Sequence, residues 1–152
     1  MAPIPISKQQ LKNHLIELVE ADINSFESAV NALNTDAQNE NKSSAGDKYE
    51  TSLEMLKQEQ NKLSERLKQA QHRKHILGQL STQPCQLVAP GALFHSHSQW
   101  FYLSVALGKV SFKGVSIFCI SPQAPIAQSF IGKKQLSSVV FQGKTYTIEE
   151  LL

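Results

Sequence analysis

Charged side chains that could do chemistry gather in one polar stretch of the sequence. Four carboxylates and two ammonium groups share it: Asp36, Glu40, Asp47 and Glu50, with Lys42 and Lys48. Asp47 is a weak candidate for a metal ligand. Ser44 and Asp47 also fit a capping box at the start of a helix, and that arrangement needs no metal. We predict that this tip, at about residues 34–49, is the working end of the chain.

Histidines and cysteines form a second group of residues with possible chemistry. His95 and His97 would lie on one face of a strand, and Cys85 or Cys119 could then complete a zinc site. No Cys-x-x-Cys pair accompanies them. The sequence has no nucleophile elbow, phosphate-binding loop or pair of acids typical of a catalytic cleft. We therefore expect a protein that is not an enzyme and has no cofactor of its own.

The charge pattern divides the chain into two halves. Residues 1–82 hold 10 Lys and Arg against 11 Asp and Glu, whereas residues 83–152 hold 5 against 2. The formal charge of +2 gives no reason to expect direct binding to nucleic acid. Two cysteines are too few for a disulfide framework, and neither a signal peptide nor an apolar run of about 20 residues occurs. We expect a cytoplasmic protein that does not enter a membrane.

A first long helix is predicted to begin at about Lys8. Ser7 and Gln10 have the spacing of a capping box. Apolar residues then recur at steps of three and four, which places them on one face: Leu11, Leu15, Leu18, Val19, Ile23, Phe26, Val30 and Leu33. Asn34 to Asn39 are expected to end the helix, because short polar side chains compete for backbone hydrogen bonds.

A second long helix follows the tip and repeats apolar residues in a heptad seam. Gln60 and Lys74 are polar gaps in this seam, and Gly78 followed by Pro84 marks its end. Each helix has an apolar stripe that needs a partner. We therefore predict an intramolecular antiparallel coiled-coil hairpin over residues 1–82, in a protein that is a monomer.

Residues 83–152 are rich in strand-forming residues and turns. The strand-like runs begin at six positions: Gln86, Ala92, Phe101, Val115, Val139 and Thr145. Gly108 and Gly114 are among the turn residues between them. Pro125 to Ile131 can form one short helix closed by Gly132. The prediction is a small antiparallel sheet of five or six strands with one helix, so the whole chain is of the α+β class.

Two segments of this half carry a family resemblance. They read Ile120-Ser-Pro-Gln-Ala-Pro-Ile-Ala-Gln-Ser-Phe-Ile-Gly-Lys-Lys and Val139-Val-Phe-Gln-Gly-Lys-Thr-Tyr-Thr-Ile. This pattern resembles the C-terminal domain of the bacterial Gre transcription elongation factors, the GreA/GreB family. With the helical hairpin in front of it, the resemblance covers nearly the whole chain. One departure is that Leu136-Ser137 stands where the family has Gly-Asp.

The resemblance implies an FKBP-like C-terminal domain and RNA polymerase as the partner. In the family this domain docks at the rim of the polymerase secondary channel, and the hairpin enters the channel. The matching positions for docking are Ser121, Pro122, Pro125, Gly132 and Lys133. At the hairpin tip, acidic residues of the family help to hold a second Mg²⁺ for transcript cleavage, so any Mg²⁺ would be shared with the polymerase.

The tip of this chain departs from the family pattern. The family reads Asp-Leu-Ser-Glu-Asn-Ala-Glu-Tyr, and its Tyr matches Tyr49, which places Lys42 and Ala45 where its metal-holding acids stand. A lysine near the polymerase metals would repel Mg²⁺. We therefore expect this tip to stimulate transcript cleavage weakly or not at all. The residues predicted to lie near the polymerase active site are Glu40, Lys42, Ser43, Ser44, Asp47, Lys48 and Tyr49.

A different class of function also fits the sequence. A coiled-coil adaptor, whose β domain binds another protein or peptide, would need the same two parts. Whether the chain co-purifies with RNA polymerase separates the two hypotheses. A prolyl isomerase would need an apolar aromatic pocket, which Trp100, Phe101 and Tyr102 alone do not provide.

Overall fold

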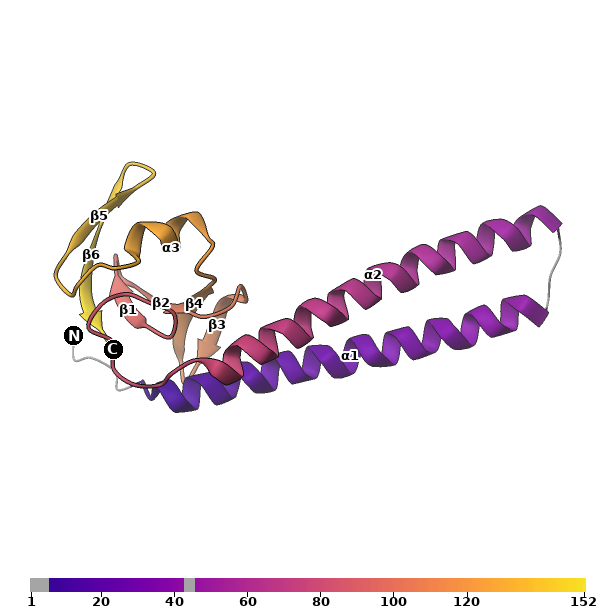
Figure 1. The fold of residues 1–152 in the computed structure, drawn as a ribbon, viewed down its shortest axis with the longest axis horizontal. Helices are drawn as coiled ribbons and strands as arrows, with labels where there is room; N and C mark the ends of the chain where they lie inside the picture. The colour runs from indigo at the N-terminus through magenta and orange to yellow at the C-terminus, as the bar shows by residue number, and fades with distance from the viewer. Residues whose placement is uncertain (1–5, 43–45) are drawn as a thin grey trace. The chain divides into compact units, whose positions relative to one another are not determined.

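Two long helices open the chain, and a β domain follows them. The computed structural model describes residues 6–42 and 46–152, apart from the side chains at positions 37 and 39–49. Helix α1 spans Lys8–Lys42 and α2 spans Gly46–Gln79 (Figure 1). The remaining elements are β1 (Leu93–Ser96), β2 (Gln99–Leu103), β3 (Gly108–Phe112), β4 (Val115–Ile120), α3 (Pro125–Phe130), β5 (Ser138–Phe141) and β6 (Lys144–Leu151). The predicted α+β class is confirmed. None of the helices in these ranges is long and apolar enough to span a membrane.

The contacts group the chain into two compact units. Ile16–His75 form one, and the other joins the start of α1, the end of α2 and the β domain. The predicted domain boundary between residues 82 and 83 stays a prediction.

Within the first unit, α1 and α2 run antiparallel (Figure 1). The Gln60 side chain donates to Asn34 Oδ1 at 2.8 Å, and Lys74 Nζ lies 3.5 Å from a carboxylate oxygen of Glu20. The step from Glu20 to Asn34 along α1 equals the step from Lys74 back to Gln60 along α2, so both contacts fit one antiparallel register. The two polar gaps of the heptad seam thus bond to the partner helix. Polar residues in a seam of this kind specify register and cost some stability.

The predicted end of α1 at Asn34 to Asn39 is wrong, because the helix continues to Lys42. The side chains of Asn34 and Thr35 form bonds that are compatible with the helix. Thr35 Oγ1 donates to the carbonyl of Asn31 at 3.1 Å, which is the bond back to residue i−4 that a helix tolerates. The Asn34 amide accepts the bond from α2 instead.

The six strands form one mixed sheet in the order β3-β4-β2-β1-β6-β5. The predicted number of strands is confirmed, but the sheet is not wholly antiparallel, because β2 and β4 pair in parallel. The chain passes from β2 to the edge strand β3 and returns as β4 between them. Two local predictions also fail: β3 begins at Gly108, expected to be a turn, and the run at Gln86 is not a strand.

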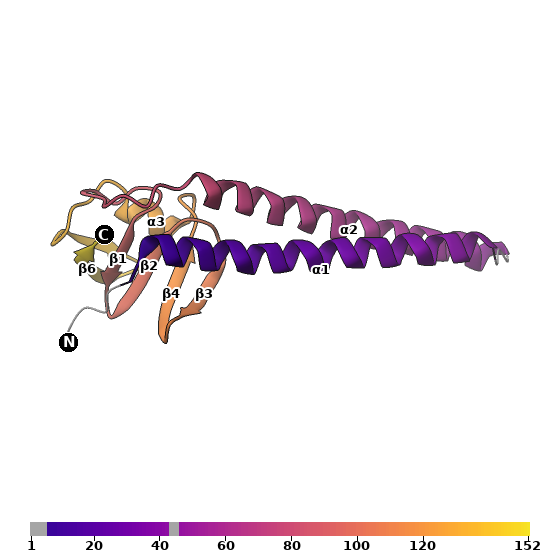
Figure 2. The same cartoon turned by 90° about the horizontal axis from the view of Figure 1, so that it is seen from below.

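Alternate residues of the sheet point into two buried layers. One layer, which includes Phe94, Phe101, Leu103 and Ile148, packs against Phe130 of α3. On the opposite face lie Tyr102, Ile117 and Cys119, all buried. The first turns of α1 lie beside this second face (Figure 2), where the His14 and Phe112 rings are 5.3 Å apart. Leu11, Leu15, Leu77 and Leu80 of the helix ends are buried with it.

Candidate functional site

The chain between β4 and β5 contains all five positions that the resemblance assigns to docking. The Ser121 carbonyl accepts the N–H of Ala124 at 3.1 Å, so the chain turns directly after β4. Pro125 is the first residue of α3, where its fixed φ suits a helix and its missing N–H loses no bond. The Gln128 side chain donates to the Pro122 carbonyl. These bonds tie the turn to the helix that follows it.

The end of α3 is held by the loop that precedes β1. Gly132 has φ +84°, a left-handed conformation that glycine adopts without steric cost. Its N–H donates to the Val88 carbonyl at 2.8 Å, and the Val88 N–H donates to the Lys133 carbonyl at 2.9 Å. The run at Gln86 therefore bonds to the end of α3 and not to a strand. Both ends of α3 have fixed positions on the β domain.

The five docking positions are all at least partly accessible to solvent. Pro125, Gly132 and Lys133 are exposed, while Ser121 and Pro122 are half-buried. The buried residues of α3, Ala127 and Phe130, point the other way into the core. These residues belong to one continuous stretch of turn, helix and loop, which we call the Ser121–Lys133 segment. Their role in docking stays a prediction.

The tip residues lie mostly outside the described part of the chain. The backbones of Glu40 and Lys42 belong to α1, and those of Asp47, Lys48 and Tyr49 belong to α2. Ser43 and Ser44 lie outside the described residues, as do the side chains of the other five. The predicted roles at the tip therefore stay predictions, including Asp47 as a metal ligand.

The structure directs His95 and His97 to different partners. His95 Nδ1 lies 2.6 Å from a carboxylate oxygen of Glu149, and its ring is 5.0 Å from that of Trp100. The His97 ring lies 5.2 Å from Tyr146, and its φ of 51° places it in the turn after β1. Among the side chains that the structure describes, which exclude those at positions 39–49, no three His, Cys, Asp or Glu are grouped to hold a metal ion.

The aromatic residues of β2 do not form an open pocket. Trp100 and Tyr102 point to one face of the sheet and Phe101 to the other, and all three are buried. Burial raises the pKa of Tyr102 to about 12, and the neighbouring thiols of Cys119 and Cys85 act in the same direction. Burial also raises the pKa of Cys119 to about 12, so that thiol is protonated and unreactive at neutral pH.

Lys8 is a buried cation that sequence analysis did not find. Its side chain is only 7% exposed, and its Nζ donates to the carbonyls of Gln83 and Leu152 at 2.8 and 3.1 Å and lies 3.7 Å from Cys85 Sγ. Burial lowers the pKa of Lys8, while Cys85 opposes this shift. A lysine in the first turn of an amphipathic helix normally points to water. Only the chain segments folded around Lys8 make it buried, so no sequence signal could have found it.

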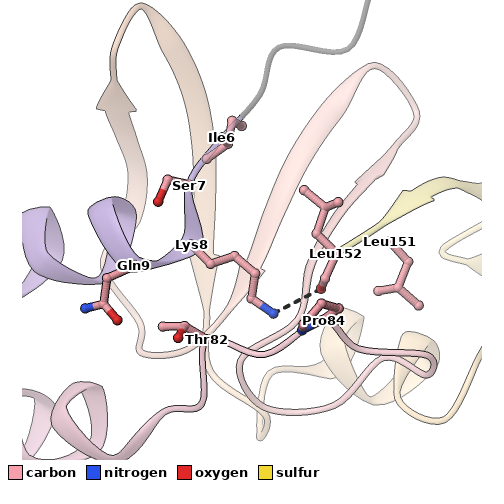
Figure 3. Close-up of a pocket in the computed structure, with 8 residues that line it drawn as sticks. All are labelled: Ile6, Ser7, Lys8, Gln9, Thr82, Pro84, Leu151 and Leu152. Atoms are coloured by element: carbon pink, nitrogen blue, oxygen red, sulfur yellow. Dashed lines mark hydrogen bonds between the residues drawn. The ribbon is translucent and has the colours of Figure 1, made fainter.

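Figure 3 shows the pocket beside Lys8, of about 330 Å³. It is lined by Ile6, Ser7, Lys8, Gln9, Thr82, Pro84, Leu151 and Leu152. An ammonium group has three donors, and those of Lys8 have two carbonyls and one sulfur as partners. The ammonium group therefore joins the start of α1 to Gln83, between α2 and β1, and to Leu152, directly after β6. With these partners it is not free to bind a ligand in the pocket.

Comparisons with known proteins found similar solved structures. No protein-family model and no curated protein matches the sequence. Two solved structures are similar, one of the transcription factor Gfh1 and one of the GreA factor homolog 1 (Gfh1) protein of Thermus thermophilus. Their sequences are 14% and 15% identical to this chain. Each match covers 90% of this chain, and 92% and 94% of the respective solved chain. The TM-score is 0.35 for both, and neither likeness assigns the chain to a family.

Proposed function

We propose that this protein is a Gre-like transcription elongation regulator that binds RNA polymerase. In this proposal the Ser121–Lys133 segment docks on the polymerase, and the tip between α1 and α2 enters the secondary channel. The polymerase contacts the nucleic acid directly. The regulator reaches nucleic acid only through the transcription complex. The protein acts as a cytoplasmic monomer and brings no cofactor of its own.

The observation that carries the proposal is the position of the sequence motif on the structure. The residues of highest resemblance fall on one accessible turn, helix and loop, fixed at both ends by backbone hydrogen bonds. A surface with a fixed backbone loses little conformational entropy when it binds. The helices add support, since they contain 35 and 34 residues and a helix of that length extends about 50 Å. That length suits a hairpin that reaches into a channel.

The charges of the tip favour a modulating role over cleavage. Lys42 and Ala45 stand where the family carries two acids, and Lys48 replaces a further one. Two metal ions stabilise the attacking and leaving oxygens in phosphodiester cleavage, and a lysine beside them opposes binding of the second. We infer that this protein occupies the channel and competes with other factors, with weak cleavage stimulation or none.

The test is binding of the full chain to the polymerase of its own organism. Lys133→Glu reverses a charge inside the Ser121–Lys133 segment, and Lys109→Glu makes the same change at an exposed position of β3. We expect Lys133→Glu to weaken binding at least tenfold, about 1.4 kcal/mol, and Lys109→Glu to have little effect. If the natural chain does not co-purify with polymerase at moderate salt, the adaptor hypothesis replaces this one.

The same complexes test the tip. In backtracked complexes, Lys42→Asp combined with Ala45→Glu restores both carboxylates and should accelerate release of 3′ RNA fragments over the natural chain. Strong cleavage by the natural protein, lost in Asp47→Ala, would show that Asp47 holds the metal and that the tip is misaligned with the family.

A further inference from the structure

The edge strand β5 leaves backbone hydrogen-bonding groups without a partner. It is the last strand of the sheet, and among the residues that the structure describes it pairs only with β6, through the two-residue turn Gln142-Gly143. Both turn residues have positive φ, 51° and 76°, as in the type I′ turn of a tight hairpin. The residues that flank such a turn exchange both of their hydrogen bonds, and the next pair exchanges none.

This alternation determines which groups of β5 face outward. Phe141 and Val139 bond to β6, and the Ile148 N–H donates to the Ser137 carbonyl at 2.9 Å in the same alternation. The N–H and C=O of Ser138 and Val140 therefore point away from β6. In the described part of the chain, no backbone group from beyond the hairpin bonds to them. A free edge of this kind is a template for another strand.

Two large apolar side chains are exposed beside these groups. Val140 is 69% exposed, and Leu136, two residues before the strand, is 75% exposed. Alternation places Val140 on the same face of the strand as Ser138. Leu136 has φ +71°, a conformation that is strained for a residue with a bulky side chain. Residues with a strained backbone cluster at functional sites. A strained backbone here presents an apolar side chain to water.

The charges around β5 indicate the chemistry of the occupant. Lys134 precedes the strand, and Lys144 pairs with Phe141 at its far end. Residues 131–148 contain no Asp or Glu. A second copy of this chain, paired through β5, would bring like charges together at both ends. A strand with acidic residues at its ends would meet both lysines favourably.

We propose that the β5 edge binds an extended segment of another protein by strand addition. The segment carries apolar side chains that cover Leu136 and Val140, and acidic residues that meet Lys134 and Lys144. Main-chain hydrogen bonds to Ser138 and Val140 supply the affinity, and the side chains supply the selectivity. This site adjoins the Ser121–Lys133 segment, because Lys134 directly follows Lys133, but its test does not require the polymerase contact proposed above.

A synthetic peptide can test this site on the full chain. The probe is Glu-Glu-Val-Thr-Val-Thr-Val-Glu-Glu with both ends blocked, and the control peptide has Lys in place of every Glu. We expect the amide resonances of Ser138 and Val140 to shift saturably with the acidic probe, with a Kd on the order of 1 mM. The control peptide should bind at least tenfold more weakly.

Variants separate the backbone contribution from the charges. Val140→Pro removes the outward N–H and leaves the bonds to β6, as an edge strand permits, and should abolish binding, whereas Val140→Thr keeps the N–H and should retain it. Lys134→Glu with Lys144→Glu leaves the backbone unchanged and should lower affinity for the acidic probe at least tenfold. Three results would overturn the proposal: no shift at about 1 mM probe, equal binding of the two peptides, or shifts that depend on protein concentration alone, which would identify a second copy as the occupant.

Discussion

Replacing Tyr102 by phenylalanine tests whether a buried hydroxyl destabilises this fold. The Tyr102 side chain is fully buried in β2, and its hydroxyl has no hydrogen-bond partner within the described residues. Leaving a buried polar group unpaired costs about 1–3 kcal/mol. Tyr102→Phe keeps the ring and removes the hydroxyl. We therefore expect the free energy of unfolding at pH 7 to rise by about 1–3 kcal/mol.

Alkaline pH gives the same substitution a second signature. Burial, with the neighbouring thiols, raises the pKa of Tyr102 from 10.0 to about 12. Between these values the unfolded chain has released the proton and the folded chain keeps it. The unfolded state then binds fewer protons, so stability falls as pH rises, by about 1.4 kcal/mol per pH unit. At about pH 11 the advantage of the variant should therefore be larger by about 1.4 kcal/mol than at pH 7. Cys119 titrates in both proteins and cancels.

The assay is urea unfolding followed by far-ultraviolet circular dichroism at both pH values. Tyr146→Phe is the matched control, because it removes a hydroxyl from a half-buried tyrosine and should change stability by less than about 0.5 kcal/mol. A loss of more than about 1 kcal/mol in Tyr102→Phe at pH 7 would show that the hydroxyl has a partner, refuting the argument. A difference that does not grow with pH would show that Tyr102 does not carry the alkaline titration.

Two substitution pairs test the packing of the two units. Leu63→Asp places an unpaired charge at a buried seam position and should cost several kcal/mol, whereas Met55→Asp, at an exposed position of the same helix, should cost less than about 0.5 kcal/mol. Equal costs in urea unfolding, or a sedimentation result showing an obligate dimer through these helices, would contradict the intramolecular hairpin. Gly91 has φ +94°, and a Cβ there would lie 2.9 Å from the Ser81 carbonyl oxygen. Gly91→Ala should therefore destabilise by more than about 1 kcal/mol. Gly78→Ala, in α2 with open space around it, should instead stabilise by about 0.5–1 kcal/mol, and the same sign for both changes would refute the reasoning.

Local patterns in the sequence were sufficient to predict the helices and the class of the fold. The start of α1 at Lys8, the end of α2 after Gly78 and the short helix after Ala124 follow from caps, prolines and glycines that act on their own neighbours. The apolar stripes likewise predicted that two long helices pair. These features depend on backbone preferences and on the 3.6-residue period, both of which are local.

The sequence predicted only part of the candidate site, because the rest depends on contacts between residues far apart in the chain. The motif identified the Ser121–Lys133 segment, but its support by the Val88 backbone is a contact between residues far apart in the chain. The exposed edge of β5 also has no signal in the sequence, since Val139 and Val140 look equally suited to a core. One is buried and the other exposed because the pleat of the strand points them to opposite faces.

The sequence by itself determined that this protein has two long paired helices and a β domain with one short helix. Only the tertiary structure decided that β2 pairs with β4 in parallel, that α1 continues through Asn34 to Lys42, and that Lys8 is buried. Strand order depends on pairings between distant segments, which no local pattern encodes. Thr35 bonds to Asn31 and Asn34 bonds to Gln60 of α2, while Lys8 bonds to Gln83 and to Leu152. For Asn34 and Lys8 the partner is far away in sequence, and for Thr35 it is one helical turn back, so the immediate neighbours of these residues do not reveal it.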